Sequence, residues 1–245
     1  MDLLTWNIQA AIGTRRYRDY FFHAHRQVVH TSAKTITLGH IAHEITPYDV
    51  VCLQEIDLGG RRAGYRSQVD TIAEMSGHAH VMVQENRVIP GISRHGNAVL
   101  SRWPLHLVRD MKLPGRIPGR GCLIVDVECP LPLDPIPLRV ACLHLSLGAS
   151  AQMQQLQAVA DMLRENPAWV AMGDFNCAAT SVPMQAFRDR AHGKLPPVAP
   201  PTYPSWRPRR DFDHIVCSTD LSLTRYAAGT AIVSDHRPVS AHLAC

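Results

Sequence analysis

Residues 169–177, with the sequence Trp-Val-Ala-Met-Gly-Asp-Phe-Asn-Cys, decide how the rest of the chain is interpreted. The apolar residues 169–172 are followed at once by Gly173, Asp174 and Asn176. Such a run beside turn-forming residues predicts a buried strand in a sheet that is covered on both faces. A glycine lets the backbone turn sharply where the strand ends. Asp174 and Asn176 are then expected at the carboxyl edge of a sheet, where α/β proteins place much of their chemistry, although a plain Asp-Asn turn explains this stretch alone equally well.

The composition is typical of a protein with one substantial core. The chain has 245 residues, of which 46% are hydrophobic, so we expect a single domain over residues 1–245. No run of 18 apolar residues occurs, so we expect no transmembrane helix and no integral membrane association. The N-terminal residues lack a basic segment, so we expect no signal peptide. The seven cysteines form no C-x-x-C pair, which favours reduced thiols in a cytoplasmic protein over disulfides or a zinc site.

A net charge of +4 permits a polyanionic partner, such as a nucleic acid, without requiring one. Basic segments lie at residues 15–16, 61–62, 116–120 and 207–210. A solvated surface is the ordinary interpretation of any one of them. The last segment directly precedes other candidate site residues, so its side chains are the best candidates for binding a phosphate: Arg207, Arg209 and Arg210.

The hydrophobic pattern predicts an α/β chain with more strands than helices. Apolar residues at helical spacing predict helices over residues 34–46, 68–76 and 150–164. Strands are expected at residues 3–8, 49–54, 80–83, 97–100, 105–108, 122–127, 138–145, 169–172, 212–217, 223–226 and 238–243. The strands at 97–100 and 105–108 are expected to pair through a turn at Trp103 and Pro104. Because hairpin-like pairs outnumber strand–helix–strand units, a mixed sheet or a pair of sheets is favoured over a doubly wound parallel sheet.

Polar side chains recur at the ends of these strands, next to apolar residues. Burying such groups is costly unless they are paired or bound to a metal. Each one alone has an ordinary structural interpretation, but together they supply the parts for metal-assisted hydrolysis. Hard oxygen ligands suit Mg²⁺ or Mn²⁺, and imidazoles beside carboxylates suit proton transfer. The residues are Asn7, Glu55, Asn97, His144, Asp174, Asn176, Asp213, His214, Asp235 and His236.

Seven short motifs, taken in order, resemble the endonuclease/exonuclease/phosphatase superfamily. They are T-W-N-I at 5–8, L-Q-E at 53–55, G-N-A-V-L-S-R at 96–102, H-L at 144–145, G-D-F-N at 173–176, F-D-H-I at 212–215 and S-D-H-R-P-V at 234–239. No single motif is decisive, but their order extends over nearly the whole chain. The resemblance implies a four-layer α/β sandwich, in which two packed mixed β-sheets are flanked by helices. It also implies Mg²⁺-dependent hydrolysis of a phosphoester substrate.

The resemblance implies a role for each matched residue. Glu55 would be the main metal ligand, and Asn7 and Asp235 would complete the acidic pocket. His236 would be the catalytic histidine, oriented by Asp213. Metal and imidazolium would neutralise charge on a pentavalent phosphorus while a polarised water attacks in line.

The G-D-F-N motif would supply two residues, Asp174 and Asn176, that position the attacking water and the scissile phosphate. Whether His236 or Asp174 takes the proton stays open at this point. Asn97 is a further candidate for binding the substrate.

His144 bears on the subfamily. Exonuclease III-like AP endonucleases have a tyrosine-containing segment here, whereas a histidine resembles deoxyribonuclease I, the neutral sphingomyelinases and the inositol-phosphate phosphatases. In those proteins a second histidine holds the phosphate or protonates the leaving oxygen. AP endonuclease activity is therefore disfavoured. In deoxyribonuclease I an acidic residue supports this histidine. In this chain, Gln84 or Glu85 lies in roughly the matching interval.

Three functions stay open from the sequence. The first is a Mg²⁺-dependent phosphodiesterase that acts as a nuclease on DNA or RNA. The second is a phosphatase or phosphodiesterase acting on phospholipid head groups, inositol phosphates or another small phosphorylated metabolite. The third, a non-catalytic binding module, is weak because every matched catalytic position holds the expected residue type. The sequence carries no signal for the substrate, for endo- or exo-action, for the number of metals or for the oligomeric state.

Overall fold

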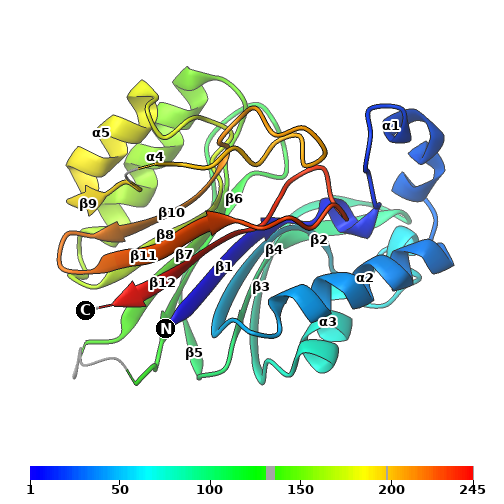
Figure 1. Ribbon diagram of the computed structural model, residues 1–245, viewed down its shortest axis with the longest axis horizontal. Helices are drawn as coiled ribbons and strands as arrows, with labels where there is room; N and C mark the ends of the chain where they lie inside the picture. The colour runs from blue at the N-terminus through cyan, green and yellow to red at the C-terminus, as the bar shows by residue number, and fades with distance from the viewer. Residues whose placement is uncertain (131–135, 197, 245) are drawn as a thin grey trace.

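Two six-stranded β-sheets pack face to face in the computed structural model, which describes residues 1–130, 136–196 and 198–244 (Figure 1). The strand order is β11-β12-β1-β2-β4-β3 in the first sheet and β5-β6-β7-β8-β10-β9 in the second. The first sheet contains β1 (Asp2–Asn7), β2 (Val50–Asp57), β3 (His80–Ile89), β4 (Ser93–Ser101), β11 (Ser222–Ala228) and β12 (Val239–Ala244). The second contains β5 (Leu105–Lys112), β6 (Gly121–Val127), β7 (Leu138–His144), β8 (Trp169–Asp174), β9 (Gly193–Lys194) and β10 (Asp213–Ser218).

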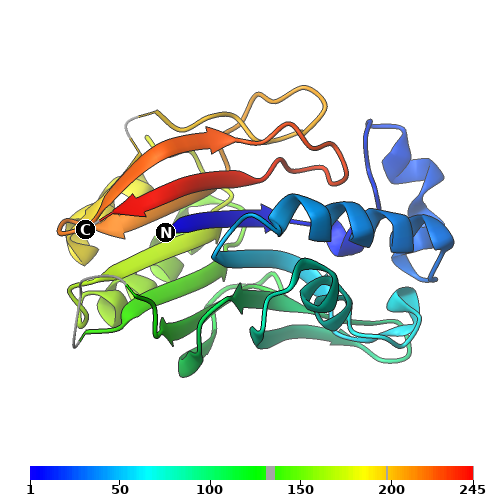
Figure 2. The same ribbon diagram turned by 60° about the horizontal axis from the view of Figure 1, so that its bottom comes forward.

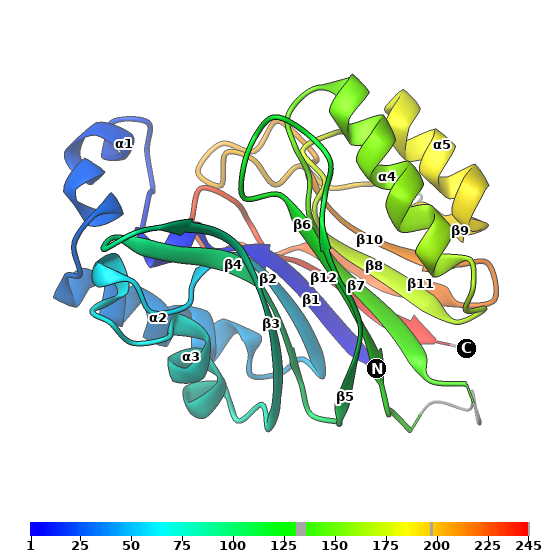
Figure 3. The ribbon, with the colours of Figure 1, turned by 180° about the vertical axis from the view of Figure 1, so that it is seen from behind.

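Helices cover the outer face of each sheet and complete four layers (Figures 1 and 3). The α-helices are α1 (Asp19–Phe22), α2 (Ser32–Ile45), α3 (Gln68–Ser76), α4 (Ala149–Leu163) and α5 (Val182–Ala191). Three short 3₁₀ turns are η1 (Gln9–Ala11), η2 (Ala24–Gln27) and η3 (Arg61–Ala63). Apolar residues of α2 and α3 pack on the first sheet, and those of α4 and α5 pack on the second. The predicted four-layer α/β sandwich is therefore confirmed.

The inner faces of the two sheets form one central core. Leu3 and Val50 from the first sheet belong to the same buried cluster as Val140 and Val170 from the second. In Figure 2 the blue strand β1 lies near the middle of the first sheet, next to the red strand β12. Because β8 has helices on one side and the first sheet on the other, both of its faces are apolar, as its sequence predicted.

Most of the predicted elements are present, and the helices agree best. The patterns at residues 34–46, 68–76 and 150–164 correspond to α2, α3 and α4. The strand predicted at residues 80–83 is longer and continues to Ile89. None of the helices among the described residues combines the length and the apolar character that crossing a bilayer requires.

Two predictions about local structure were wrong or incomplete. The strands β4 and β5 follow each other through Trp103 and Pro104 but do not pair, because β4 pairs with β2 and β3 while β5 pairs with β6 in the other sheet. A short turn looks the same in sequence whether the chain forms a hairpin or crosses between sheets. Helix α5 was not predicted, although Pro183 stands in its first turn and Met184 and Phe187 bury its inner face.

Candidate active site

His144, Asp174 and Asp213 lie side by side at one edge of the second sheet. His144 ends β7, Asp174 ends β8 and Asp213 begins β10. The strand register places His144 opposite Asp174, and Asp174 opposite Asp213. All three side chains are buried, and a buried charge is costly unless it is paired or hydrogen-bonded.

Gly173 allows β7 and β8 to approach closely at this edge. The sequence predicted that Gly173 would form the turn after the strand, but it lies inside β8, opposite Leu143. A Cβ atom at this position would collide with the carbonyl oxygen of Leu143. Glycine is therefore required for close approach of the two backbones rather than for a turn.

The carboxylate of Asp174 is surrounded by polar side chains from both sheets. Its Oδ2 accepts a hydrogen bond of 3.0 Å from Nδ2 of Asn7, at the end of β1. The same oxygen lies 3.4 Å from Nε2 of His144 and 3.8 Å from Nε2 of His236. Its Oδ1 accepts a hydrogen bond of 2.9 Å from the backbone N–H of Asn176. Burial raises the pKa of Asp174 to about 7, although the charge of His236 acts in the opposite direction.

His236 is held from its far nitrogen by a buried carboxylate. Its Nδ1 lies 2.8 Å from Oδ2 of Asp213, an oxygen that also accepts a hydrogen bond from the Thr202 hydroxyl. The Tyr203 ring packs against the imidazole with the ring centres 4.9 Å apart. Burial alone would lower the pKa of His236, but the carboxylates of Asp213 and Asp174 raise it well above its usual value. The geometry therefore favours an imidazolium.

His144 has the opposite electrostatic surroundings. Its Nδ1 faces Nη1 of Arg120 at 3.3 Å. Because a guanidinium can only donate, Nδ1 is the acceptor and Nε2 carries the ring proton. Burial and the charge of Arg120 hold the pKa of His144 well below its usual value. Nε2–H of a neutral imidazole therefore points toward Asp174 and, at 3.9 Å, toward Glu55.

The residues expected to support His144 are engaged elsewhere. Gln84 donates hydrogen bonds to the side chain of Asp110 and to the backbone of β6, and Glu85 accepts one of 2.6 Å from Arg94. Neither side chain is hydrogen-bonded to His144. An arginine takes that position instead.

Glu55 presents a charged carboxylate with no hydrogen bond from any described residue. It lies in β2 at a bulge, where the pairing with β4 shifts between Leu53 and Ile56, and its backbone φ is 58°. A left-handed glutamate inside a strand is strained and turns the side chain out of the regular alternation. Burial would raise its pKa, but the nearby basic side chains of His95, His144, His236 and Arg120 lower it to about 2. The side chain is therefore an ionised oxygen donor.

A cavity of about 440 Å³ lies beside Glu55 and is lined by several cationic residues. Arg62 is already paired with the buried Asp57 and also contacts Nδ1 of His95. The guanidinium of Arg120 faces His144, and its buried Nε has no hydrogen-bond partner among the described residues. The basic residues in the lining are Arg62, Arg87, His95 and Arg120.

Asp235 is buried on the other side of the site and accepts several hydrogen bonds. Its Oδ2 accepts 2.7 Å and 3.0 Å bonds from the hydroxyl of Tyr20 and Nε2 of Gln9. Its Oδ1 accepts one of 3.2 Å from Ser234. Burial raises its pKa, and the charge of His236 opposes this. Asp235 is therefore more fully hydrogen-bonded than Glu55.

Three of these ionisable side chains form a compact group. Single ligand atoms of Asp174, Asp213 and His236 lie within 4.8 Å of one another. Asp213 and His236 are hydrogen-bonded to each other, so the group consists of an Asp–His pair beside a second carboxylate, that of Asp174. The side chain of Asn176 donates to the carbonyl of Leu145, so it is anchored at the edge of the same group.

Two sets of predicted substrate-binding residues lie outside this centre. Asn97 is fully buried, and its Nδ2 donates to Gln84 and to the carbonyl of Gly121, the residue that pairs with His144 in the sheet. The loop between Tyr203 and Phe212 approaches the site, because its first residue packs against His236. The three arginines of that loop are exposed: Arg207, Arg209 and Arg210.

The sequence analysis did not identify several residues that contact the site. Gln9, Tyr20 and Thr202 bond to the two aspartates that flank His236, and Arg120 bonds to His144. Of these residues, only Arg120 was covered by the sequence analysis, as the last residue of the basic segment 116–120. Gln9 directly follows the strand predicted at residues 3–8, so the same signal could have found it. Tyr20, Arg120 and Thr202 follow no predicted strand, so the signal does not apply to them.

Known proteins resemble this chain in sequence and in fold. The profile of the Endonuclease/Exonuclease/phosphatase family matches residues 4–236. The uncharacterized protein YbhP of Escherichia coli K12 is 31% identical over 224 residues, which cover 80% of this chain and 83% of that protein.

Solved structures show the same fold over the whole chain. An endonuclease/exonuclease/phosphatase from Beutenbergia cavernae superposes with a TM-score of 0.74 at 25% identity and covers 100% of this chain and 71% of its own. The mannosyl-6-phosphatase Bt3783 of Bacteroides thetaiotaomicron has a TM-score of 0.71 at 16% identity, with 100% of both chains covered. Sphingomyelinase C from Streptomyces griseocarneus has a TM-score of 0.63 at 15% identity and covers 100% of this chain and 99% of its own.

Proposed function

The chain belongs to the endonuclease/exonuclease/phosphatase family, and we propose that it is a Mg²⁺-dependent phosphoester hydrolase that uses in-line attack of water. The observation that carries the proposal is the position of Asp174. Its Oδ2 lies 3.4 Å from Nε2 of His144 and 3.8 Å from Nε2 of His236, and it accepts the amide of Asn7. A carboxylate between two imidazoles can orient a water molecule and exchange a proton with it. Residues 1–245 would act as one catalytic domain.

Glu55 would hold the cation, with the oxygens of Asn7 and Asp235 as further ligands. The fit is supported by the donor set, since Glu55 is ionised and has no hydrogen-bond donor among the described residues. Carboxylate and amide oxygens are the ligands that Mg²⁺ and Mn²⁺ prefer. When bound, the cation would neutralise charge on a phosphoryl oxygen. Asp235 already accepts bonds from Tyr20 and Gln9, so we assign it a weaker share of the binding than Glu55.

Asp174 would orient the attacking water and accept its proton. We assign this role to Asp174 rather than to His236 because the hydrogen bond from Nδ1 of His236 to Asp213 stabilises an imidazolium. An imidazolium can donate to a phosphoryl oxygen but has no lone pair with which to accept a proton. The backbone N–H of Asn176 and the amide of Asn7 fix the orientation of the Asp174 carboxylate from two sides.

His144 would donate Nε2–H to the phosphate or to the leaving oxygen. The guanidinium of Arg120 occupies the acceptor Nδ1, so only Nε2 is available to the substrate. A fixed neutral donor at this position stabilises developing negative charge without itself gaining a proton.

A phosphodiester, including DNA or RNA, is the first substrate class that we propose. It is supported by the net charge of +4 and by the exposed arginines of the loop that packs on His236: Arg207, Arg209 and Arg210. The second class is a lipid head group, an inositol phosphate or another small phosphorylated metabolite. The cavity of about 440 Å³ beside Glu55 favours it, because a bounded hollow suits a compact leaving group better than a long strand.

A substrate panel tests both parts of the proposal. Purified protein with Mg²⁺ or Mn²⁺ is assayed on plasmid DNA, RNA, phospholipids, inositol phosphates and bis-p-nitrophenyl phosphate, beside Asp174→Ala and His236→Ala. We expect hydrolysis of at least one class and a loss of at least about 10³-fold in both variants. Activity that survives in both variants would contradict the assignment of the site. A steep decline in nucleic-acid binding with salt would favour the first substrate class over the second.

A further inference from the structure

Residues 15–28 form a projecting segment that exposes several large aromatic side chains. It contains α1 and η2, and Figures 1 and 3 show it standing away from both sheets above the end of α2. The exposed fractions are 65% for Tyr17, 83% for Phe21 and 65% for Phe22. The two phenylalanine rings contact each other edge to face, with centres 6.0 Å apart. Phenylalanine has no polar group that could form a hydrogen bond with water. Exposed aromatic side chains gathered in one segment therefore indicate a surface that binds a partner.

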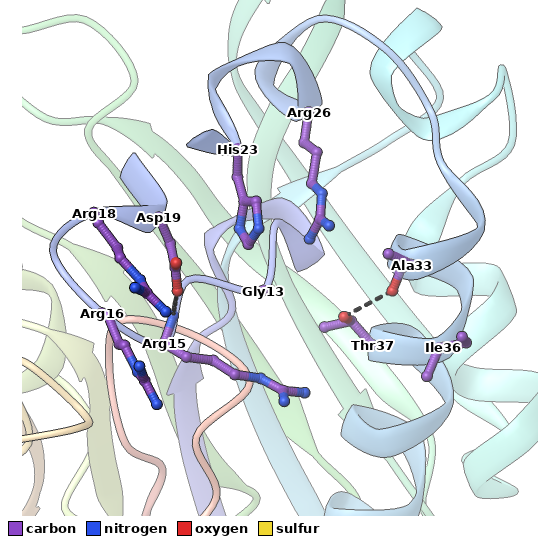
Figure 4. Close-up of a pocket in the computed structure, with 10 residues that line it drawn as sticks. All are labelled: Gly13, Arg15, Arg16, Arg18, Asp19, His23, Arg26, Ala33, Ile36 and Thr37. Carbon is purple, nitrogen blue, oxygen red and sulfur yellow. Dashed lines mark hydrogen bonds between the residues drawn. The ribbon is translucent and has the colours of Figure 1, made fainter. Parts of the chain in front are cut away.

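The same segment is strongly cationic. It has four arginines and one acidic residue, Asp19, whose carboxylate accepts a hydrogen bond of 2.8 Å from the backbone N–H of Arg15. Figure 4 shows arginines from the start of the segment, with Arg26 and His23 from its end, around a cavity of about 460 Å³. Guanidinium groups bind phosphate oxygens with two parallel hydrogen bonds, so this hollow suits a phosphate-bearing group.

The segment is also attached to the rim of the candidate active site. The hydroxyl of Tyr20 donates to Asp235, and the ring of Tyr17 lies 5.1 Å from that of Trp206. Gln27 and Val28 line the cavity beside Glu55. Whatever binds the exposed face of residues 15–28 therefore lies next to the catalytic groups.

We propose that residues 15–28 bind the surface of a membrane that contains anionic phospholipids. Arg15, Arg16 and Arg18 would bind lipid phosphates, while Phe21 and Phe22 would enter the boundary between head groups and acyl chains. Apolar rings flanked by arginines are the combination that binds anionic interfaces. A single-stranded nucleic acid is disfavoured, because stacking platforms line a basic groove, whereas Phe21 and Phe22 belong to α1, which projects from the sheets (Figure 1).

Vesicle flotation tests the proposal and needs no turnover, so its failure would leave the proposed hydrolase standing. We expect the full chain to float with vesicles of phosphatidylcholine and phosphatidylglycerol, to bind phosphatidylcholine alone weakly, and to be released by salt. Phe21→Ser with Phe22→Ser should lower the partition coefficient at least about tenfold. Arg16→Glu with Arg18→Glu should lower it by a factor of at least about 20.

Matched controls lie on other faces of the molecule. The control variants are Val182→Ser and Arg109→Glu. Val182 is 73% exposed at the start of α5, and Arg109 is exposed in β5. Both variants should float like the wild type. Absence of flotation, equal losses in the controls, or full binding by the double phenylalanine variant would each overturn the proposal. The proposal would also be overturned if the protein bound a fluorescent oligonucleotide but no vesicles, and the same variants abolished that binding.

A second measurement does not depend on the double variants folding. Phe21→Trp places a reporter at the exposed tip, and its emission is compared with that of the wild type to subtract the native tryptophans. We expect the added emission to shift to shorter wavelengths with anionic vesicles and not with neutral ones. If the added tryptophan keeps the emission of a water-exposed tryptophan with both anionic and neutral vesicles, insertion is refuted.

Discussion

His236 and Asp213 are joined by a hydrogen bond of 2.8 Å between Nδ1 and Oδ2, and the Asp213 carboxylate stabilises positive charge on the imidazole. On the opposite side of the same ring, Nε2 lies 3.8 Å from Asp174. The imidazole is therefore placed between two carboxylates, and in the proposed mechanism this arrangement makes His236 the acid and Asp174 the base. The following predictions test that separation and the site around it.

Replacing Asp213 by asparagine should lower the pKa of His236. Burial lowers that pKa and the two carboxylates raise it, so removing one charge leaves burial less opposed and His236 loses its proton at a lower pH. NMR titration of the metal-free protein measures this shift directly, and turnover should fall at least about 10²-fold. Thr202→Val is the control, because it removes a hydrogen bond to the same carboxylate but no charge. An unchanged His236 pKa in Asp213→Asn would contradict the assignment.

Glu55→Ala should abolish metal binding and cost at least about 10³-fold in turnover, or about 4 kcal/mol of transition-state stabilisation. The carboxylate of Glu55 is ionised and accepts no hydrogen bond from any described residue. Calorimetric titration with Mn²⁺ and Mg²⁺ measures the binding independently of activity. Glu85→Ala is the matched control, since that carboxylate is partly exposed and paired with Arg94. Equal metal affinity in both variants would exclude Glu55 as the main ligand.

Removing divalent cations should stop hydrolysis reversibly. We expect no turnover in EDTA and full recovery when Mg²⁺ or Mn²⁺ is added in excess, because the phosphoryl charge then lacks its counterion. Thermal unfolding followed in parallel controls for loss of the fold. Unchanged turnover in the chelator, with the substrate identified by the panel, would argue against metal catalysis.

Arg120→Met should raise the pKa of His144 and reduce turnover. Burial and Arg120 both lower that pKa, so without the guanidinium the imidazole accepts a proton at higher pH and its tautomer is no longer fixed. NMR titration of His144 and steady-state kinetics measure the two effects. Arg116→Met is the control, because Arg116 is exposed in the same loop. A wild-type His144 titration in Arg120→Met would show that the contact is incidental.

Gly173→Ala should destabilise the fold by at least about 2 kcal/mol. The added Cβ would collide with the carbonyl oxygen of Leu143, which is backbone and cannot move aside cheaply. Gly39→Ala in α2 is the control, since its Cβ would meet only the flexible end of Met75 at 3.4 Å and alanine favours the helix. Chemical denaturation measures both. A Gly173→Ala protein as stable as Gly39→Ala would refute the close-approach argument.

The sequence by itself determined the elements and most of the candidate site. The spacing of apolar residues defined α2, α3 and α4, because burial on one face imposes a local period. Polar residues at strand ends identified Asn7, Asp174 and other residues that the structure brings together, since strand ends meet at one edge of a sheet. Motif order extended this to the family and the four-layer fold.

Only the tertiary structure decided which strands pair and how the site is charged. The turn between β4 and β5 crosses from one sheet to the other, which short-range turn chemistry cannot encode. Arg120 reaches the site from the loop before β6 and Tyr20 from the short helix α1, so no local pattern marks them. The opposite charge states of His144 and His236 follow from a guanidinium beside one ring and a carboxylate beside the other. Electrostatic interactions act through space over a few ångströms, and the chain order does not contain those distances.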